Sequence, residues 1–511
     1  MTCAAETKLY SGLNPKEKMT GSTSEKRDIE HVHDSPPSPY NGNMFAKIVQ
    51  SIIIGMTIGV IHFKTTIKTE YILFTHCLAI VGVFQMFILR TYKHVCYKYE
   101  VIYAIYLPFI LSFCFNRSLV TINTILSLNV IILYNISNGI YNLPIIFSTQ
   151  ILCCYFFDDH DLSYSIIAIL VNFSLSIFLQ RIGQLKSLDN IDCNLFSIML
   201  TNVFYFNYNS TSVPFRILHG TLSALICVII INYSISKLAK NWLNSHRYIL
   251  SLTQSSVIIC GFPMLTNYFI YIPEHKSPLE WLFNYITRST IRQCIFIGWF
   301  TLVAILVPTF MVFQSKVTLN TSRKLWHFLV FLMITIPFKY DPEFVKIALA
   351  GIIPLFLCIE YIRYLKIEPI GSYLDSKLRS FADERDLKGP LIISYIYLIL
   401  GIAFPLLVHN SPVGLISLGI GDSLASIVGK KMGRYHWPQS NKTIEGTIAF
   451  ISSTFIVCKI LQSSLNYFQN VSTLIIALMC LLSGVLEGNS ILNDNILIPS
   501  FMLICEYLFT Y

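Results

Sequence analysis

The sequence predicts an all-α, polytopic integral membrane protein. Its 511 residues are 54% hydrophobic and only 13% charged, whereas an ordinary soluble protein carries about a quarter charged residues. Apolar runs of roughly 15 to 22 residues follow one another from about Met44 to the last residue, and an α-helix needs about 20 residues to cross a bilayer. From these runs we expect about 15 to 17 transmembrane helices.

Three parts of the chain differ in character. Residues 1–43 are polar and rich in Ser, Pro, Lys and Glu, which predicts a disordered cytosolic tail. We expect residues 44–313 to form an N-terminal multispanning region and residues 314–511 to form a C-terminal catalytic membrane domain. The 14 cysteines lie scattered through the apolar runs without CxxC spacing, which indicates buried structural thiols.

The loop charges predict an orientation in the membrane. With 17 spans, alternate loops fall into two sets, of which the first carries 21 Lys and Arg and the second carries 8. The first set comprises residues 90–100, 135–142, 180–192, 236–248, 314–324, 363–389, 429–443 and the short turn after Glu487. Because positively charged loops stay in the cytosol, this set faces the cytosol and the C-terminus lies across the membrane. In a membrane protein, the net charge of +9 reflects this asymmetry of the loops. We expect no nucleic-acid partner.

The first polar motif on the predicted cytosolic side is Asn320-Thr-Ser-Arg323-Lys324-Leu-Trp326-His327. We expect Asn, Thr or Ser to cap a helix on which Lys324 and His327, three residues apart, share a face. Arg323, Lys324 and His327, helped by the free N–H groups of a helix start, can hold a phosphate. The alternative is a positively charged membrane anchor with an interfacial Trp.

The second motif lies in the longest cytosolic loop and reads Arg379-Ser-Phe-Ala-Asp383-Glu384-Arg385-Asp386-Leu-Lys388-Gly-Pro. Asp383 and Asp386 offer hard oxygen ligands of the kind that Mg²⁺ prefers, or they hold Arg385 towards a nucleotide. The alternative is a solvated charge cluster whose acids and bases neutralise one another.

The third motif, LGIGDSLASIVGKKMGRYHWPQSNKTIEG, covers residues 418–446. Its glycines allow close helix packing or close approach of a ligand. Packing does not explain Asp422 at the cytosolic end of a span, where an unpaired carboxylate is costly. Glu445, one turn into the next helix, is placed to take a metal ion or a ribose hydroxyl. The motif also offers cations to a triphosphate: Lys430, Lys431, Arg434 and Lys442.

The fourth motif is Leu486-Glu487-Gly-Asn-Ser-Ile-Leu-Asn493-Asp494-Asn495-Ile-Leu-Ile-Pro499. Acids and amides inside an apolar run, followed by Pro, predict a broken helix that lines a cavity. A plain interhelical turn is the alternative. Neither a G-x-x-x-x-G-K-[ST] loop nor the set of protein-kinase motifs occurs in the chain.

Two further patterns carry little weight. Asp158-Asp-His160-Asp161 resembles a metal cluster but falls in a very short loop on the non-cytosolic side. Asn209-Ser-Thr and Asn470-Val-Ser are glycosylation sequons on the same side, although such matches are frequent by chance.

The order of these residues resembles the signature of dolichol kinases and their relatives, the CTP-dependent polyprenol and phytol kinases. The similar elements are Ser-Arg-Lys-x-x-His at 322–327, Asp-x-Arg-Asp before Gly-Pro at 383–390, the third motif, and Asp-Asn-x-x-x-Pro at 494–499. The third motif also resembles phosphatidate cytidylyltransferases. Asn493 stands where those enzymes have Lys, and their following Gly-His-Gly-Gly and Asp-Arg-x-Asp elements do not occur, which argues against their reaction.

The resemblance implies a dolichol kinase of the endoplasmic reticulum membrane, with its active site facing the cytosol. Such an enzyme transfers the γ-phosphoryl group of CTP to dolichol, giving dolichyl phosphate for protein glycosylation and CDP, with Mg²⁺ or another divalent cation. The residues expected in catalysis are Asp422, Lys442, Glu445 and Asp494. Those expected to bind CTP are Arg323, Lys324, His327, Lys430, Lys431, Arg434, Lys442, Thr443, Glu445 and Gly446. Those expected to bind metal are Asp422, Asp383 and Asp386.

Two other kinds of function stay open from the sequence. One is another CTP-dependent lipid kinase or an enzyme like the phosphatidate cytidylyltransferases. The other is an ion-coupled transporter in which Asp422, Glu445, Glu487 and Asp494 relay ions. Against the transporter, the two halves of the chain show no repeat and the acids gather at one face of the membrane.

Overall fold

The computed structural model describes most of the chain from residue 119 onwards. The described residues are 119–135, 143–183 without 159, 188–207 without 189, 212–238, 247–272, 277–313, 319–379, 382, 386, 389–490 without 439, 493–510, and eight positions between 45 and 56. Every described element is a helix, and the one extended pairing is a single bridge between His436 and Thr443. The expected all-α class is therefore confirmed.

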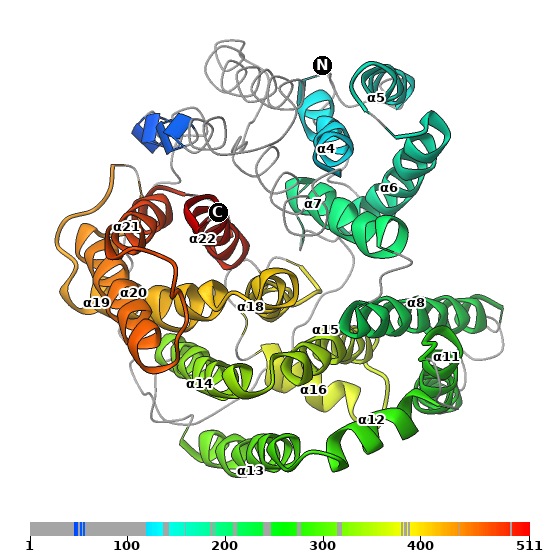
Figure 1. Cartoon of the computed structure of the whole chain (residues 1–511). Helices are drawn as coiled ribbons and strands as arrows, with labels where there is room; N and C mark the ends of the chain where they lie inside the picture. Colours follow the sequence, from blue (N-terminus) through cyan, green and yellow to red (C-terminus); the bar gives the residue numbers. More distant parts are fainter. Residues whose placement is uncertain are drawn as a thin grey trace, which may run out of the picture. The chain divides into compact units, whose positions relative to one another are not determined.

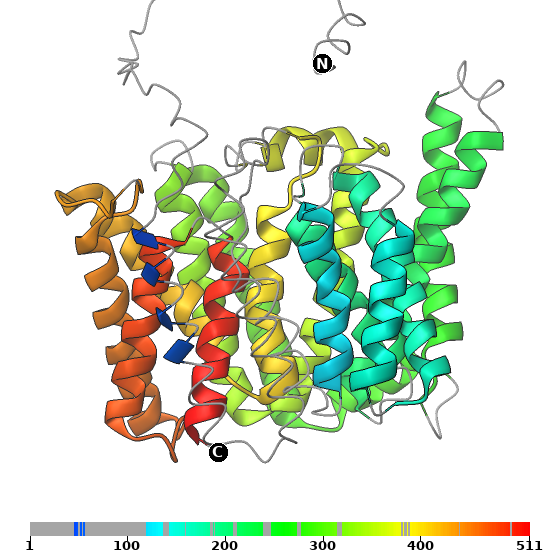
Figure 2. The ribbon, with the colours of Figure 1, turned by 90° about the horizontal axis from the view of Figure 1, so that it is seen from above.

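The helices run roughly side by side, up and down, as Figures 1 and 2 show. The first group is α4 (Val120–Asn135), α5 (Leu143–Phe157), α6 (Leu162–Gly183), α7 (Asn190–Thr201) and the π-helix η5 (Asn202–Phe206). The second group is α8 (Val213–Leu238), α10 (Arg247–Ser256), the π-helix η6 (Val257–Gly261), α11 (Phe262–Phe269), α12 (Pro278–Thr287) and α13 (Thr290–Phe313). The third group is α14 (Leu319–Tyr340), α15 (Pro342–Tyr364), α16 (Gly371–Arg379), α18 (Ser394–His409), the π-helix η8 (Leu415–Gly421), α19 (Asp422–Met432), α20 (Ile444–Ser464), α21 (Thr473–Asn489) and α22 (Asp494–Thr510).

Several of these helices are suited to a bilayer. Five in the described residues are long and apolar enough to cross it, or six if α12 and α13, which are bent by 103° at the break between them, count as one broken span. Three shorter apolar helices add to these. The chain is therefore a multi-pass membrane protein, while the expected total of 15 to 17 spans stays a prediction because residues 57–118 lie outside the description.

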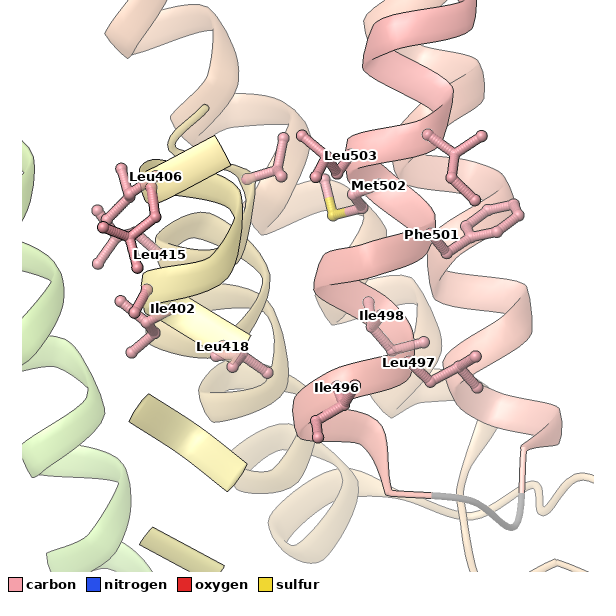
Figure 3. Packing of buried hydrophobic residues seen from close by; sticks show 14 of the residues in the cluster. Ile402, Leu406, Leu415, Leu418, Ile496, Leu497, Ile498, Phe501, Met502 and Leu503 are labelled. Atoms are coloured by element: carbon pink, nitrogen blue, oxygen red, sulfur yellow. The ribbon is translucent and has the colours of Figure 1, made fainter. Parts of the chain in front are cut away.

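The core of the third group is built around α22. Its residues 496–498 and 501–505 are all buried, so no side of the helix is exposed over that stretch. Figure 3 shows Ile402 and Leu406 of α18, and Leu415 and Leu418 of η8, packed opposite α22. The same cluster reaches the first group, where the rings of Phe196 on α7 and Tyr397 on α18 lie 5.4 Å apart.

Glycines set the spacing between helices at two places in the third group. A Cβ added at Gly401 on α18 would lie 1.8 Å from the carbonyl oxygen of Asn495, at the start of α22. One added at Gly414 would lie 2.3 Å from the carbonyl oxygen of Gly401. Only residues without side chains let these backbones approach so closely, and this contact fixes the height of α22 beside α18.

Candidate active site

Asp422 lies at the junction of η8 and α19, held between two other helices. A Cβ added at Gly419 would lie 2.7 Å from the Cβ of Phe331 on α14, and one at Gly421 would lie 2.6 Å from the Cγ2 of Thr454 on α20. These glycines therefore serve close packing, as one of the two sequence interpretations held. π-helical segments are rare and frequent at functional sites, and this one delivers Asp422 to a point between α14 and α20.

The first of two ion-pair clusters, here called the Asp422 cluster, joins α14 to α19. Lys324 Nζ donates a hydrogen bond to Asp422 Oδ2, and His327 Nδ1 lies 3.5 Å from the same oxygen. The three side chains are only 12%, 8% and 15% exposed for Lys324, His327 and Asp422, respectively. Pairing compensates the cost of burying the carboxylate. Lys324 and His327 lie on one helical face as predicted, whereas α14 begins at Leu319, so residues 320–322 lie inside its first turn and not before it.

The second cluster, here called the Lys442 cluster, joins the loop before α20 to α21 and α22. Lys442 Nζ lies 2.7 Å from Glu487 Oε1, from the Glu487 backbone carbonyl oxygen and from Asp494 Oδ2. Burial disfavours the charged ammonium, but the carboxylates of Asp494 and Glu487 outweigh it and raise the pKa of Lys442 above its ordinary value. Lys442 is therefore a permanent cation held by two acids.

The two clusters belong to one site. Gly421, next to Asp422, and Gly488, next to Glu487, both lie against side chains of α20. The residues of the clusters come from α14, α19, α21, α22 and the loop before α20; α14 packs on α19, α20 packs on both α19 and α21, and α21 packs on α22. Asp494 is the first residue of α22, α21 ends at Asn489, and the two helices pack side by side, so the fourth motif lies at an interhelical turn, the alternative to the predicted broken helix.

A short hairpin presents Lys442. The Trp437 backbone N–H donates to the Lys442 carbonyl at 3.0 Å, and the Ile444 N–H donates to the Tyr435 carbonyl at 2.8 Å. Thr443 caps α20 by accepting a hydrogen bond from the Gly446 N–H at 3.1 Å. The Thr-x-x-Gly end of the third motif is thus a helix start that fixes the direction in which Lys442 leaves the backbone.

Glu445 also braces this hairpin. Its carboxylate accepts hydrogen bonds from the backbone N–H groups of Arg434 at 2.9 Å and of Tyr435 at 3.2 Å. The structure therefore does not bring Glu445 into either cluster. Its expected roles at a metal or a ribose stay predictions, now beside an observed role in loop geometry.

Trp437 closes the far side of the hairpin. Its Nε1 donates to Thr447 Oγ1 at 2.9 Å, and a Cβ added at Gly488 would lie only 2.4 Å from that Nε1. Trp437 thus lies against the residue that follows Glu487. Its ring also stacks on Phe45 of the N-terminal segment, with centroids 6.1 Å apart.

The remaining predicted cations lie around the site. Lys430 and Lys431 are exposed in the last turn of α19, Arg434 is exposed in the hairpin, and Arg323 is half-buried on α14 beside Lys324. These side chains form a basic rim, and their predicted contact with nucleotide stays a prediction.

Asp386 has a structural environment away from both clusters. It is buried, and its Oδ1 accepts hydrogen bonds from the backbone N–H groups of Ile393 at 2.9 Å and Ser394 at 3.3 Å, at the start of α18. Asp383 lies outside the described residues. In the part of the chain that the structure describes, no group of three His, Cys, Asp or Glu side chains is arranged to hold a metal ion. The metal roles of Asp383 and Asp386 stay predictions.

A buried network of charged side chains joins α15, α16 and α18. The Arg363 guanidinium is fully buried and binds the carboxylates of Glu360 and Asp375, each at 2.5 Å. Tyr395 on α18 donates to Glu360 at 2.6 Å. Hydrogen bonds from Arg379, Lys366 and Arg363 outweigh the effect of burial and hold the pKa of Asp375 below its usual range. These acids are therefore neutralised internally.

The weaker patterns have local explanations. Asp158 accepts a hydrogen bond from Ser165 at 2.5 Å and pairs with His160 at 2.8 Å. These contacts stabilise the turn between α5 and α6. Asn470 is exposed, and Asn209 lies outside the described residues.

Sequence reasoning did not include Glu487, Trp437 and Thr447 among the expected catalytic, nucleotide-binding or metal residues. An acid inside an apolar run was the available signal for Glu487. No signal marks Trp437 or Thr447, because a hydrogen bond between residues ten apart across a hairpin leaves no pattern in the sequence.

Comparison with known proteins decides the family. The family model of the dolichol kinase N-terminal domain matches residues 40–208. A dolichol kinase of Saccharomyces cerevisiae is 48% identical over 440 residues, which cover 86% of this chain and 82% of that protein. This chain belongs to the dolichol kinase family.

More distant relatives match about half of the chain or less. The dolichol kinase of Homo sapiens is 30% identical over 256 residues, 45% of this chain and 47% of that protein. A probable chloroplastic phytol kinase of Oryza sativa is 30% identical over 205 residues, 37% of this chain and 64% of that protein. No solved structure matches the chain. The match at residues 40–208 also places a family-specific domain in the N-terminal half, where the motifs gave no resemblance beyond a multispanning region.

Proposed function

We propose that this chain is a dolichol kinase that transfers the γ-phosphoryl group of CTP to the terminal hydroxyl of dolichol in the endoplasmic reticulum membrane. The 48% identity over most of the chain supports the family activity. The observation that supports the assignment of the site is the pair of clusters: two buried or half-buried lysines and three acids at the ends of adjacent helices. Buried charges of this kind in a membrane protein mark functional sites.

The chemistry asks for positioning and charge neutralisation. The dolichol oxygen forms a bond to the γ-phosphorus, the bond from that phosphorus to the bridging oxygen breaks, and CDP leaves with the electron pair. Such transition states are loose and spread negative charge over the phosphoryl oxygens. Lys442 and Lys324 supply positive charge there, with Lys430, Lys431 and Arg434 attracting the triphosphate.

A divalent cation fits this site only together with the nucleotide. Mg²⁺ usually reaches a protein through one or two carboxylates plus substrate phosphates, and it keeps several waters. Asp422 and Asp494 can supply such carboxylates, in agreement with the absence of a three-ligand group in the described residues. The ion would neutralise phosphate charge. Asp422 would bind it or accept the proton of the alcohol, and Lys442 would bind phosphate oxygens.

The rival reactions differ in their products. A cytidylyltransferase would release pyrophosphate and form a CDP-linked lipid, whereas the kinase releases CDP and forms dolichyl phosphate. An ion-coupled transporter would bind no nucleotide. Family membership favours the kinase over both.

A single assay tests donor, acceptor and products together. The detergent-purified full chain is supplied with γ-labelled CTP or ATP and a panel of lipid alcohols, with Mg²⁺ present. We expect label in dolichyl phosphate with CTP in preference to ATP, and CDP in equal amount. Pyrophosphate in step with a CDP-lipid, or equal use of ATP, would contradict the proposal.

Topology needs a separate test. The proposal places residues 363–389 and 429–443 in the cytosol and the C-terminus in the lumen. Tags in those two loops should be cleaved by protease added to sealed microsomes, while a C-terminal tag should be protected. Protected loop tags would overturn the cytosolic active site.

A further inference from the structure

Three oxygen atoms surround the Lys442 ammonium in this structure. Lys442 Nζ donates hydrogen bonds to the Glu487 carbonyl oxygen and to Asp494 Oδ2, and it forms an ion pair with Glu487 Oε1, each at 2.7 Å. A lysine ammonium carries three protons and accepts none. A phosphate oxygen that binds this ammonium therefore competes with these oxygens.

The three partners are not equally replaceable. Glu487 holds Lys442 through both its carboxylate and its backbone carbonyl, and its side chain is 9% exposed. The next residue, Gly488, lies under the indole of Trp437. Asp494 makes one contact, stands at the first position of α22 and is 28% exposed, as is Lys442 itself. The open side of the ammonium is therefore the side of Asp494.

Charge also favours an exchange on that side. With both acids ionised, the Lys442 cluster carries one net negative charge, and Asp422 adds to the negative potential at Glu487. A nucleoside triphosphate is repelled by such a cluster as long as both carboxylates face it. Moving Asp494 away leaves a neutral Lys442–Glu487 pair with one donor directed outwards.

We propose that Asp494 is an exchangeable partner that a nucleotide phosphate displaces from Lys442, and that Glu487 is a positioning residue that keeps the ammonium in place. This inference rests on the proposed function. The contact between Lys442 and Asp494 is then a closed form of the nucleotide site, and the affinity of wild-type protein for CTP is reduced by the population of that form.

The test is equilibrium binding of labelled CTP to the full chain in detergent, with divalent cations removed by chelator. Asp494→Asn keeps the shape but removes the competing charge, so it should bind CTP about tenfold more tightly than wild type, and Asp494→Ala should change affinity in the same direction. Adding Lys442→Ala to Asp494→Asn should abolish the gain. Unchanged or weaker CTP binding in both Asp494 variants would overturn the exchange.

Glu487 is tested by the opposite change. Glu487→Gln should weaken CTP binding by about tenfold and raise the KM for CTP more than it lowers kcat, and Glu487→Asp should restore part of the loss. The matched control is Glu506→Gln, because Glu506 is a half-buried acid on the neighbouring helix α22, where it accepts a hydrogen bond from Ser411 near the far end of that helix. Equal losses in Glu487→Gln and Glu506→Gln would overturn the positioning role. If wild-type protein binds neither CTP nor ATP, with or without Mg²⁺, the proposed function fails, which is a result different from either of these.

Discussion

The paired polar side chains of the first helix group differ from those of the candidate active site in their charge and in their exposure to solvent. In the first group, Asn123 on α4 and Asn202 on η5 exchange two hydrogen bonds of 3.2 and 2.9 Å, and both side chains are fully buried. In the active site, the partners are charged, and Asp494 and Lys442 remain 28% exposed. A closed pair of neutral amides joins helices, whereas charged pairs with an open side can bind a ligand.

The same contrast extends along each group. Asn172 on α6 donates to Ser197 on α7 at 3.1 Å, and Gln150 on α5 donates to the Ile125 carbonyl of α4 at 3.1 Å. These bonds connect successive helices of the first group without any net charge. Buried polarity by itself therefore does not identify a site in this protein; charge together with partial exposure does.

The largest effect that this comparison predicts is at Asp422. Asp422→Asn keeps the shape but removes the charge that a metal ion or a proton needs, so turnover should fall by about 100- to 1,000-fold while the protein still accumulates. Turnover at saturating CTP and dolichol, with protein measured by immunoblot, checks this. Near-normal turnover would remove Asp422 from the catalytic residues and direct attention to Asp494.

The next effect is at Lys442. In the proposed function Lys442 binds a phosphate oxygen of CTP, so in Lys442→Ala the KM for CTP should rise by about tenfold or more, with less change in the KM for dolichol. Lys459→Ala is the matched control, because Lys459 lies on α20, the helix that follows Lys442, and donates hydrogen bonds to Gln462 and Thr473. Equal changes in the two lysine variants would mean that Lys442 acts only through helix stability.

Sequence patterns identified Asp422, Lys442 and Asp494, but not their arrangement. An acid or a lysine in an apolar chain is conspicuous because its burial is costly, so each could be found alone. Lys324 and Asp422 are 98 residues apart, and their pairing depends on how α14 packs on η8. The glycines permit this packing, but no residue spacing in the sequence predicts it. The orientation of Glu445 towards the hairpin backbone could not be predicted either. Helical periodicity gives the position of a residue on its helix, but not the path of the loop that folds against the helix.

The fold was predictable in class and less so in detail. The composition and the length of the apolar runs predicted a helical membrane protein, because both reflect the apolar interior of the bilayer directly. Hydropathy cannot detect the π-helical segment η8 or the 103° bend between α12 and α13, because the hydropathy of an apolar run does not depend on the path of its backbone.

A smaller effect, on stability and not on catalysis, is expected in the first group. Asn202→Leu removes the two hydrogen bonds that the buried Asn123 amide makes with Asn202, which should lower the free energy of unfolding by about 1–3 kcal/mol without changing the KM for CTP of the folded protein. Thermal unfolding in detergent, beside CTP kinetics, measures both. Replacing Asn123 with Leu as well should recover part of the loss, and a changed KM would show that the neutral pairs also shape the site.

The smallest effect concerns the ring contact between Phe45 of the N-terminal segment and Trp437 of the hairpin. Phe45 stacks on Trp437 but is 43% exposed, so loss of the ring should cost at most about 1 kcal/mol of hairpin ordering. Phe45→Ala should therefore raise the KM for CTP by no more than about fivefold, since each 1.4 kcal/mol changes an equilibrium tenfold. Ile52→Ala is the control, because Ile52 belongs to the same segment and is 56% exposed. A larger KM change for Phe45 than for Ile52 would mean that the N-terminal region helps to order the nucleotide loop, whereas equal values would confine the site to the third helix group.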